Sequence, residues 1–324
     1  MRYFVLVLSK WVTALAPAVW GTTYYVTTEH LPPDRPLLAG LLRALPAGLL
    51  LVAVTRRVPR GDWWWRSLVL GTLNIGVFLP LLFLAAYRLP GGVAATVGAV
   101  QPLIVAGLAV LLLGQRMTTR TALAGIAGVA GVALLVLRAD ARLDLVGVAA
   151  ALGGAVAMAA GVVLSKRWTS PAPLLAVTGW QLVVGGLVLL PVTFLVEGAP
   201  PAMTAANVGG FLYLGIIGGA VSYALWFRGI RVLAATQVTF LGLLSPVVAT
   251  TVGWLVLGQG LSALQVVGAV VVLAALVVAQ RNPAQRNPAQ RNPAQRNPTR
   301  KVEREKKVEQ EGESGADHRV RSVR

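Results

Sequence analysis

Ten apolar stretches of 17 to 25 residues cover most of this chain. A bilayer core about 30 Å thick needs roughly 20 apolar residues per helix, and only helices and closed barrels satisfy their own backbone hydrogen bonds there. Apolar residues make up 56% of the chain and charged residues 13%, whereas a soluble domain carries roughly 25% charged residues. The pattern excludes an ordinary soluble protein and predicts an all-α integral membrane fold with ten transmembrane helices. The predicted spans are Trp11–Thr28, Pro36–Thr55, Ser67–Tyr87, Gly92–Leu113, Thr121–Leu137, Leu145–Leu164, Ala172–Val196, Val208–Phe227, Ala234–Leu257 and Leu261–Ala279.

The basic residues indicate an orientation. A formal charge of +17 taken alone would suggest a nucleic-acid binder, but cytoplasmic loops of membrane proteins also carry an excess of Lys and Arg. Ten Lys and Arg residues fall in the even-numbered connections between spans, and four fall in the odd-numbered ones. We therefore expect a protein of the bacterial inner membrane with both termini in the cytoplasm and no nucleic-acid partner.

The first stretch has a second interpretation as a secretory signal peptide, because Arg2 precedes an apolar run and Ala14-Leu15-Ala16 is similar to a cleavage site. Pro17 follows directly, and Lys10 interrupts the segment that would be the hydrophobic region. These features favour an uncleaved first helix.

The chain also repeats itself. A shift of 144 residues superimposes Gly71 on Gly215, Gly98 on Gly242, Pro102 on Pro246, and Gly114-Gln115 on Gly258-Gln259. Ten spans give five per copy, and an odd number of crossings forces the two copies into opposite orientations. We expect one five-helix repeat at residues 1–137 and a second, inverted one at 138–279. Inverted repeats are typical of secondary transporters, whose binding site lies near the bilayer midplane between the repeats.

Several short motifs resemble a known family. They are Trp20-Gly21-Thr22, Arg43, a Leu-x-x-Leu-Ala-x-Tyr-Arg run that ends at Arg88, Pro102, and the Leu-Gly-Gln turn that follows it. In this order the motifs resemble the EamA branch of the drug/metabolite transporter superfamily. The resemblance implies a ten-helix exporter or exchanger of small metabolites, with a central cavity lined by helices one, three, four, six, eight and nine.

One departure from the family pattern concerns the turns after helices four and nine, where relatives commonly carry an acidic residue. Here both positions are glutamine, Gln115 and Gln259. Either a proton-carrying carboxylate has been lost, or the residue only caps the following helix. Thr118 and Ser262 could share that capping task through their side-chain oxygens, which is the interpretation we favour.

Polar and aromatic side chains inside the spans are the candidate substrate-binding residues, because buried polar groups in hydrocarbon need partners. Gln101-Pro102 and Ser245-Pro246 are equivalent helix breaks, since each proline frees a carbonyl one turn back. Interhelical hydrogen bonding without substrate contact is the alternative for each residue. The candidates are Trp20, Tyr24, Arg43, Asn74, Gln101, Pro102, Gln181, Tyr223, Trp226, Gln237, Ser245 and Pro246; Trp180 belongs to the same lining.

Arg43 is the charged member of this set. It lies seven residues after Pro36, about 10 Å into the second span at a rise of 1.5 Å per residue. Because arginine stays protonated in proteins, it needs acceptors. Two hypotheses remain open: Arg43 attracts a substrate carboxylate or phosphate, or it is a structural residue bonded to helix ends or to Glu29.

The spans hold no central Asp, Glu or His, and these are the side chains that form proton relays in transporters. We therefore expect facilitated transport, exchange, or coupling through the substrate's own protons. The same inventory, together with the absence of cysteine, argues against an enzyme, a cofactor and a metal site. The remaining alternative is a non-transporting membrane scaffold whose basic tail recruits a partner.

From Gln280 the composition changes to four copies of Gln-Arg-Asn-Pro. A proline every five residues forbids a regular helix, so residues 280–324 are expected to form a disordered basic cytoplasmic tail. Binding of this tail to anionic lipid headgroups is the alternative to simple solvation. Beyond the bilayer and a small-molecule substrate, a monomer and a homodimer both remain open.

Overall fold

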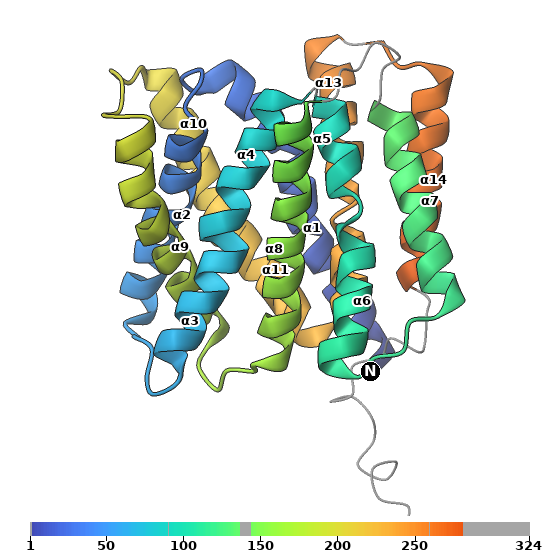
Figure 1. The fold of residues 1–324 in the computed structure, drawn as a ribbon, viewed down its shortest axis with the longest axis horizontal. Helices are drawn as coiled ribbons and strands as arrows, with labels where there is room; N and C mark the ends of the chain where they lie inside the picture. Colours follow the sequence, from blue (N-terminus) through green and yellow to red (C-terminus); the bar gives the residue numbers. More distant parts are fainter. Residues whose placement is uncertain (1, 90, 137–143, 259, 281–324) are drawn as a thin grey trace, which may run out of the picture. The chain divides into compact units, whose positions relative to one another are not determined.

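The computed structural model describes residues 2–89, 91–136, 144–258 and 260–280, and these residues form an all-helical bundle without β-strands (Figure 1). The predicted tail after Gln280, the proposed repeat boundary at 137–138 and Gln259 lie outside the described residues. The elements are α1 Arg2–His30, α2 Pro36–Thr55, α3 Trp63–Gly71, η1 Thr72–Val77, α4 Phe78–Arg88, α5 Gly91–Gly98, α6 Gln101–Leu113, α7 Thr119–Val136, α8 Leu145–Arg167, α9 Leu174–Val196, α10 Ala205–Gly215, η2 Ile216–Val221, α11 Ser222–Val232, α12 Ala235–Leu241, α13 Leu244–Leu257 and α14 Ala263–Gln280.

Each predicted span falls on a helix or on consecutive helical segments. Within the described residues, 8 helical segments are long and apolar enough to cross a membrane. The other two predicted spans correspond to α1, which extends the first span toward the N-terminus, and to α7, whose apolar part is the shorter Thr119–Leu135. The helical, multi-span character of the chain is therefore confirmed, while the count of ten crossings stays a prediction.

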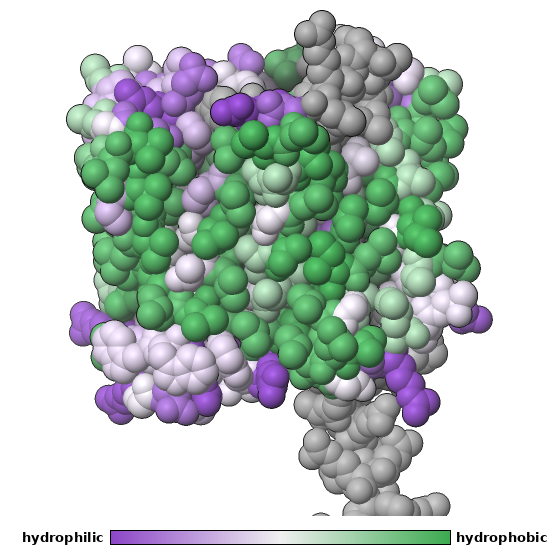
Figure 2. Space-filling view, viewed as in Figure 1, coloured by the Kyte–Doolittle hydropathy of each residue, from purple (hydrophilic) through white to green (hydrophobic). Residues whose placement is uncertain are grey.

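The surface of the bundle is apolar around its middle. Figure 2 shows a broad green band over the helices, with purple residues gathered toward the two ends. Large aliphatic side chains are exposed on the bundle, among them Leu111, Leu123, Leu195 and Leu264. Soluble proteins rarely expose apolar patches of this extent, so the band is the surface that faces lipid.

Two long helical segments each contain a π-helical turn at the same place in the repeat. Thr72–Val77 (η1) separates α3 from α4, and Ile216–Val221 (η2), 144 residues further along, separates α10 from α11. A π-turn inserts an extra residue and changes the partners of the backbone carbonyls, and such turns often occur at functional sites. The sequence patterns did not predict these two turns.

The helix breaks predicted at the paired prolines are confirmed. Helix α5 ends at Gly98 and α6 begins at Gln101, while α12 ends at Leu241 and α13 begins at Leu244. Because proline has no N–H to donate to the preceding turn, Pro102 and Pro246 lie in the first turn of the new helix.

Helices α2 and α9 pack closely through glycine. A Cβ atom placed on Gly48 would lie 2.5 Å from the backbone nitrogen of Val183, and one placed on Gly186 would lie 2.6 Å from the Cβ of Leu45. These contacts are reciprocal, because Val183 is 138 residues after Leu45 and Gly186 is 138 residues after Gly48. The pairing of a later residue on one helix with an earlier residue on the other makes the two helices antiparallel.

Replacing Gly48 with alanine tests this contact. The added methyl group meets backbone atoms of α9 that cannot rotate away, and overpacking of this kind costs about 1–3 kcal/mol. We expect a lower melting temperature for detergent-solubilised protein, followed by tryptophan fluorescence. The matched control is Gly107→Ala, since a Cβ at Gly107 meets nothing within 4 Å; equal melting temperatures for the two variants would contradict the contact.

Candidate functional site

Arg43 is buried in the interior of the bundle, with 3% of its surface exposed. Its Nη2 donates a hydrogen bond to the backbone oxygen of Gly218, 3.2 Å away. Its guanidinium carbon lies 6.0 Å from the ring centroid of Trp20 and 5.9 Å from that of Tyr223. A carbonyl oxygen and the negative faces of aromatic rings both stabilise a buried cation. The surroundings of Arg43 therefore offset part of the free-energy cost of removing its guanidinium from water.

The carbonyl of Gly218 is a shared acceptor. Trp20 Nε1 donates to the same oxygen at 3.0 Å, and a carbonyl has two lone pairs to accept both bonds. Gly218 lies in the π-helical turn η2, where the regular carbonyl pairing is altered. The neighbouring Gly219 allows close approach of α2, because a Cβ there would lie 2.6 Å from the backbone oxygen of Arg43.

Aromatic rings complete this cluster. The Trp20 ring lies 5.2 Å from both the Tyr223 and the Trp226 rings, and Tyr223 stacks on Phe227 at 5.9 Å. Trp226 is 2% exposed, and its Nε1 has no hydrogen-bond acceptor among the described residues. Buried indole N–H groups usually find a partner, so this one is a buried donor that stays unpaired among the described residues. We call Trp20, Arg43, Gly218, Tyr223 and Trp226 the arginine cluster.

A second polar cluster surrounds the equivalent π-turn, η1. Asn74 is fully buried, and its Nδ2 donates to Gln181 Oε1 at 2.8 Å and to Ser165 Oγ at 3.3 Å. Its Oδ1 has no partner among the described residues. A Cβ placed on Gly161 would overlap the Asn74 side chain. We call Asn74, Ser165 and Gln181 the amide cluster.

The two clusters occupy equivalent places. Asn74 and Gly218 are 144 residues apart, as are η1 and η2, and Arg43 and Gln181 are 138 residues apart, as are the reciprocal contacts of α2 and α9. In the first half, the π-turn η1 carries Asn74, whose side chain donates a hydrogen bond to Gln181. In the other half, the equivalent residue is Gly218, and a Cβ placed there would have Arg43 and Leu214 as its nearest neighbours, each at 3.8 Å.

The remaining candidates lie apart from these clusters or at their edges. Gln237 is at the start of α12, where Gln280 Nε2 donates to its backbone oxygen at 2.7 Å. Trp180 donates to the backbone oxygen of Arg57 at 2.8 Å, near the end of the bundle. Pro102 is buried; Gln101, Ser245 and Pro246 are half-buried beside the helix breaks. Tyr24 is part of α1, and its side chain lies outside the described set.

The structure bears on two open alternatives. One hydrogen-bond acceptor of Arg43 is the carbonyl of Gly218 in the π-helical turn η2, which fits the hypothesis of a structural residue bonded to helix backbone. Capping by Thr118 and Ser262 is confirmed: Thr118 Oγ1 accepts from the Thr121 N–H and Ser262 Oγ from the Gln265 N–H, each at 3.2 Å. The glutamines in the turns therefore need not cap the next helix.

The sequence patterns do not single out Gly218, Gly161 or Ser165 as site residues. The signal available for Gly218 was the 144-residue repeat, which pairs it with Asn74. Within the described ranges no group of three or more His, Cys, Asp or Glu side chains could hold a metal ion.

Comparisons with known proteins agree on one family. A family model described as the EamA-like transporter family matches residues 9–137 and 145–280. Protein PecM of Dickeya dadantii is 49% identical over 261 residues, which cover 80% of this chain and 88% of PecM. A WAT1-related chloroplastic protein of Arabidopsis thaliana is 34% identical over 286 residues, covering 82% of this chain and 67% of that protein. A Salmonella typhimurium protein named a probable amino-acid metabolite efflux pump is 28% identical over 279 residues, covering 80% and 90%.

A solved crystal structure supports the fold independently. It superposes with a TM-score of 0.72 at 20% sequence identity, covering 84% of this chain and 96% of the other.

A double-mutant cycle tests the geometry of the amide cluster. Gly161→Ala should destabilise the protein by about 1–3 kcal/mol, because its methyl group displaces the Asn74 side chain. In an Asn74→Ala background the same change should cost much less, since the space is then empty. Melting temperatures of the four proteins give the coupling; additive effects would contradict the contact between Asn74 and Gly161.

Proposed function

This chain belongs to the EamA-like transporter family, and from that premise we propose that it is a secondary exporter or exchanger that works by alternating access. The family and its named relatives make it a multi-pass membrane transporter of small metabolites. Our proposal adds the direction, the mechanism, the substrate chemistry and an inner-membrane location with both termini in the cytoplasm.

The proposed architecture is ten helices in two inverted repeats, residues 1–137 and 138–279. Elements from α3 to α6 recur about 144 residues later as α10 to α13, including the π-turns and the proline breaks. Figure 1 supports the inversion, since α3 and α6 lie toward one end of the bundle and their counterparts α10 and α13 toward the other. Two packed repeats of opposite orientation can expose a central site to each side in turn.

The observation that carries the proposed function is the convergence of two donors in the arginine cluster. The guanidinium of Arg43 and the unpaired N–H of Trp226 both border Trp20, in a region of aromatic rings. Planar guanidinium groups bind carboxylates with two parallel hydrogen bonds, and ring faces bind flat apolar groups. The cluster therefore suits a substrate that combines an anionic group with an apolar or aromatic body.

Amino acids, organic anions and drug-like carboxylates share that chemistry. The name of the Salmonella relative refers to efflux of amino-acid metabolites, which supports the same substrate class and the outward direction for this chain. In the proposal Trp20, Arg43, Tyr223 and Trp226 contact substrate directly; the other candidates named from the sequence remain predictions.

Removing the guanidinium tests this assignment. Purified protein in liposomes is screened for saturable flux of a panel of labelled amino acids and aromatic carboxylates, and Arg43→Ala should lower the flux of the transported compound. Loss of a hydrogen bond to a charged group predicts a reduction of roughly ten- to a hundredfold. Arg120→Ala is the matched control, because Arg120 is exposed at the start of α7.

Folding is checked by size-exclusion chromatography for each variant. An Arg43→Ala protein that folds normally and transports at the parental rate would refute substrate binding by Arg43. If the parent shows no saturable flux with any compound of the panel, the substrate class is wrong.

A further inference from the structure

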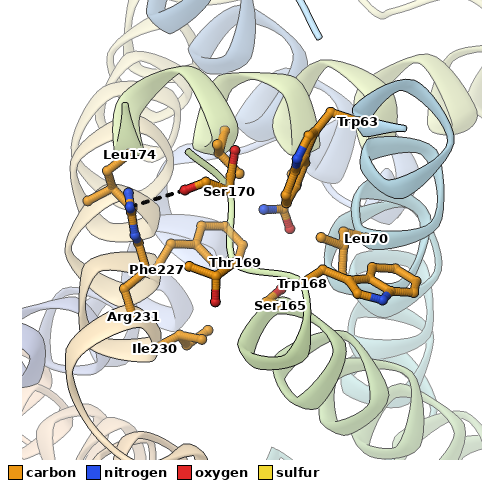
Figure 3. A pocket seen from close by; sticks show the side chains of 12 residues that line it. Trp63, Leu70, Ser165, Trp168, Thr169, Ser170, Leu174, Phe227, Ile230 and Arg231 are labelled. Atoms are coloured by element: carbon orange, nitrogen blue, oxygen red, sulfur yellow. Dashed lines mark hydrogen bonds between the residues drawn. The ribbon is translucent and has the colours of Figure 1, made fainter. Parts of the chain in front are cut away.

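A small pocket opens at the end of the bundle where α3 and α9 begin and α8 and α11 end. Its volume is about 30 Å³, which is room for a single water molecule. Figure 3 shows Trp63 and Trp168 facing Phe227 and Arg231 across it. In the orientation that the loop charges indicate, this is the cytoplasmic end.

The walls of the pocket repeat the chemistry of the arginine cluster. Trp63, Trp168 and Phe227 contribute aromatic surface, and Arg231 contributes a guanidinium. Arg231 is exposed, and the hydrogen bond found for it is a long one of 3.4 Å to the backbone oxygen of Ser170, dashed in Figure 3. Most of its five N–H donors are therefore available to an anion.

The pocket ends at the amide cluster. Ser165 and Gln181 line it, and both accept hydrogen bonds from Asn74 behind them. Asn74 itself is fully buried, so the contact lies between the pocket and the interior of the bundle.

Both polar contacts join opposite halves of the repeat. Arg43 belongs to α2 and bonds η2, whereas Gln181 belongs to α9 and bonds η1. Arg43 lies seven residues after the start of α2, and Gln181 lies seven residues after the start of α9. Since α2 and α9 are antiparallel, the two contacts lie on opposite sides of the bundle's middle. A motion of one half of the repeat against the other can therefore break the Arg43–Gly218 contact or the Asn74–Gln181 contact without breaking both.

The closed amide contact is incompletely satisfied. Asn74 Oδ1 is buried without a partner among the residues described, and such a group loses its bonds to water without replacement. Turning the amide by 180° would place an N–H at the same edge, so this edge is unpaired in either orientation. Water that enters from the pocket can form a hydrogen bond with this edge of Asn74, which favours opening of the contact between Asn74 and Gln181.

We infer that this pocket is the inner mouth of the transport path for carboxylate-bearing compounds with a flat apolar part, and that the contact between Asn74 and Gln181 closes it. The inference rests on the proposed function. Ser165, Asn74 and Gln181 thereby act as positioning residues that set when the path opens to the inside. Arg231 and the tryptophans receive the substrate there.

The absence of cysteine makes thiol labelling a clean test. Met158 is 2% exposed and lies on the same face of α8 as Ser165, seven residues deeper, so Met158→Cys reports access beyond the closed contact. Thr169→Cys, at an exposed residue of the mouth, shows that the reagent arrives. The probe is a membrane-impermeant charged maleimide, applied to intact cells for the outer side and to inside-out vesicles for the inner side.

Asn74→Leu or Gln181→Leu alone should raise labelling of Met158→Cys from the inner side about tenfold, which is the population change expected for one lost buried hydrogen bond. The double variant should return to the parental rate, because replacing both partners by apolar groups restores packing. Thr178→Val is the matched control, since the Thr178 hydroxyl bonds the carbonyl of Leu174 within its own helix at 3.0 Å.

A rise from the outer side, an equal rise with Thr178→Val, or no rise in single variants that insert like the parent would overturn the inference. A double variant that labels as fast as the singles would also overturn it. The single-cysteine parent is tested for solute flux in parallel, so absent flux identifies a failure of the proposed function separately from the labelling result.

Discussion

A guanidinium that cannot lose its proton is held inside a membrane bundle, and the surrounding structure follows from that constraint. An isolated charge at this depth is strongly unfavourable. The structure meets it with a carbonyl from a π-helical turn and with the faces of Trp20 and Tyr223. Glycine in that turn is required because any side chain at position 219 would meet the backbone of Arg43. The π-helical turn η2 thus supplies the acceptor that the buried Arg43 needs.

The two halves use one backbone plan for different chemistry. Each half contains a π-turn, a proline break and a central helix packed through glycine. Asparagine stands at the π-turn of the first half and glycine at that of the second, so one contact is a neutral amide pair and the other a charged cluster. A substrate that moves between them would meet a neutral contact on one side and an anion-binding group on the other. In the proposed mechanism this difference would give the inward-facing and outward-facing states different affinities for an anionic substrate.

The sequence predicts most of the helices because hydrocarbon requires long apolar runs, and Pro36–Thr55 is found with the predicted bounds. It also predicts the breaks at Pro102 and Pro246, since proline leaves a local signature. The π-turns are not predictable in this way, because one extra residue in a turn leaves no mark on composition or hydropathy. The equivalence of Arg43 and Gln181 is hidden by a change of offset from 144 to 138, because α9, α10 and the connection between them are longer than α2, α3 and their connection. Residue type alone does not separate Gln237 from the other candidates, yet its backbone oxygen accepts a hydrogen bond from Gln280 at a helix end.

We propose that this carrier alternates access without a buried acidic relay. The acids in the described part of the chain lie at helix ends or in turns. Glu197, for example, accepts from the Leu37 N–H at 2.6 Å and the Leu38 N–H at 3.0 Å. The most direct test is counterflow: liposomes are loaded with an unlabelled substrate, ionophores collapse all ion gradients, and entry of the labelled compound is followed. We expect transient, saturable accumulation of label above its external concentration. Absence of counterflow, together with accumulation driven by a pH gradient alone, would contradict the account.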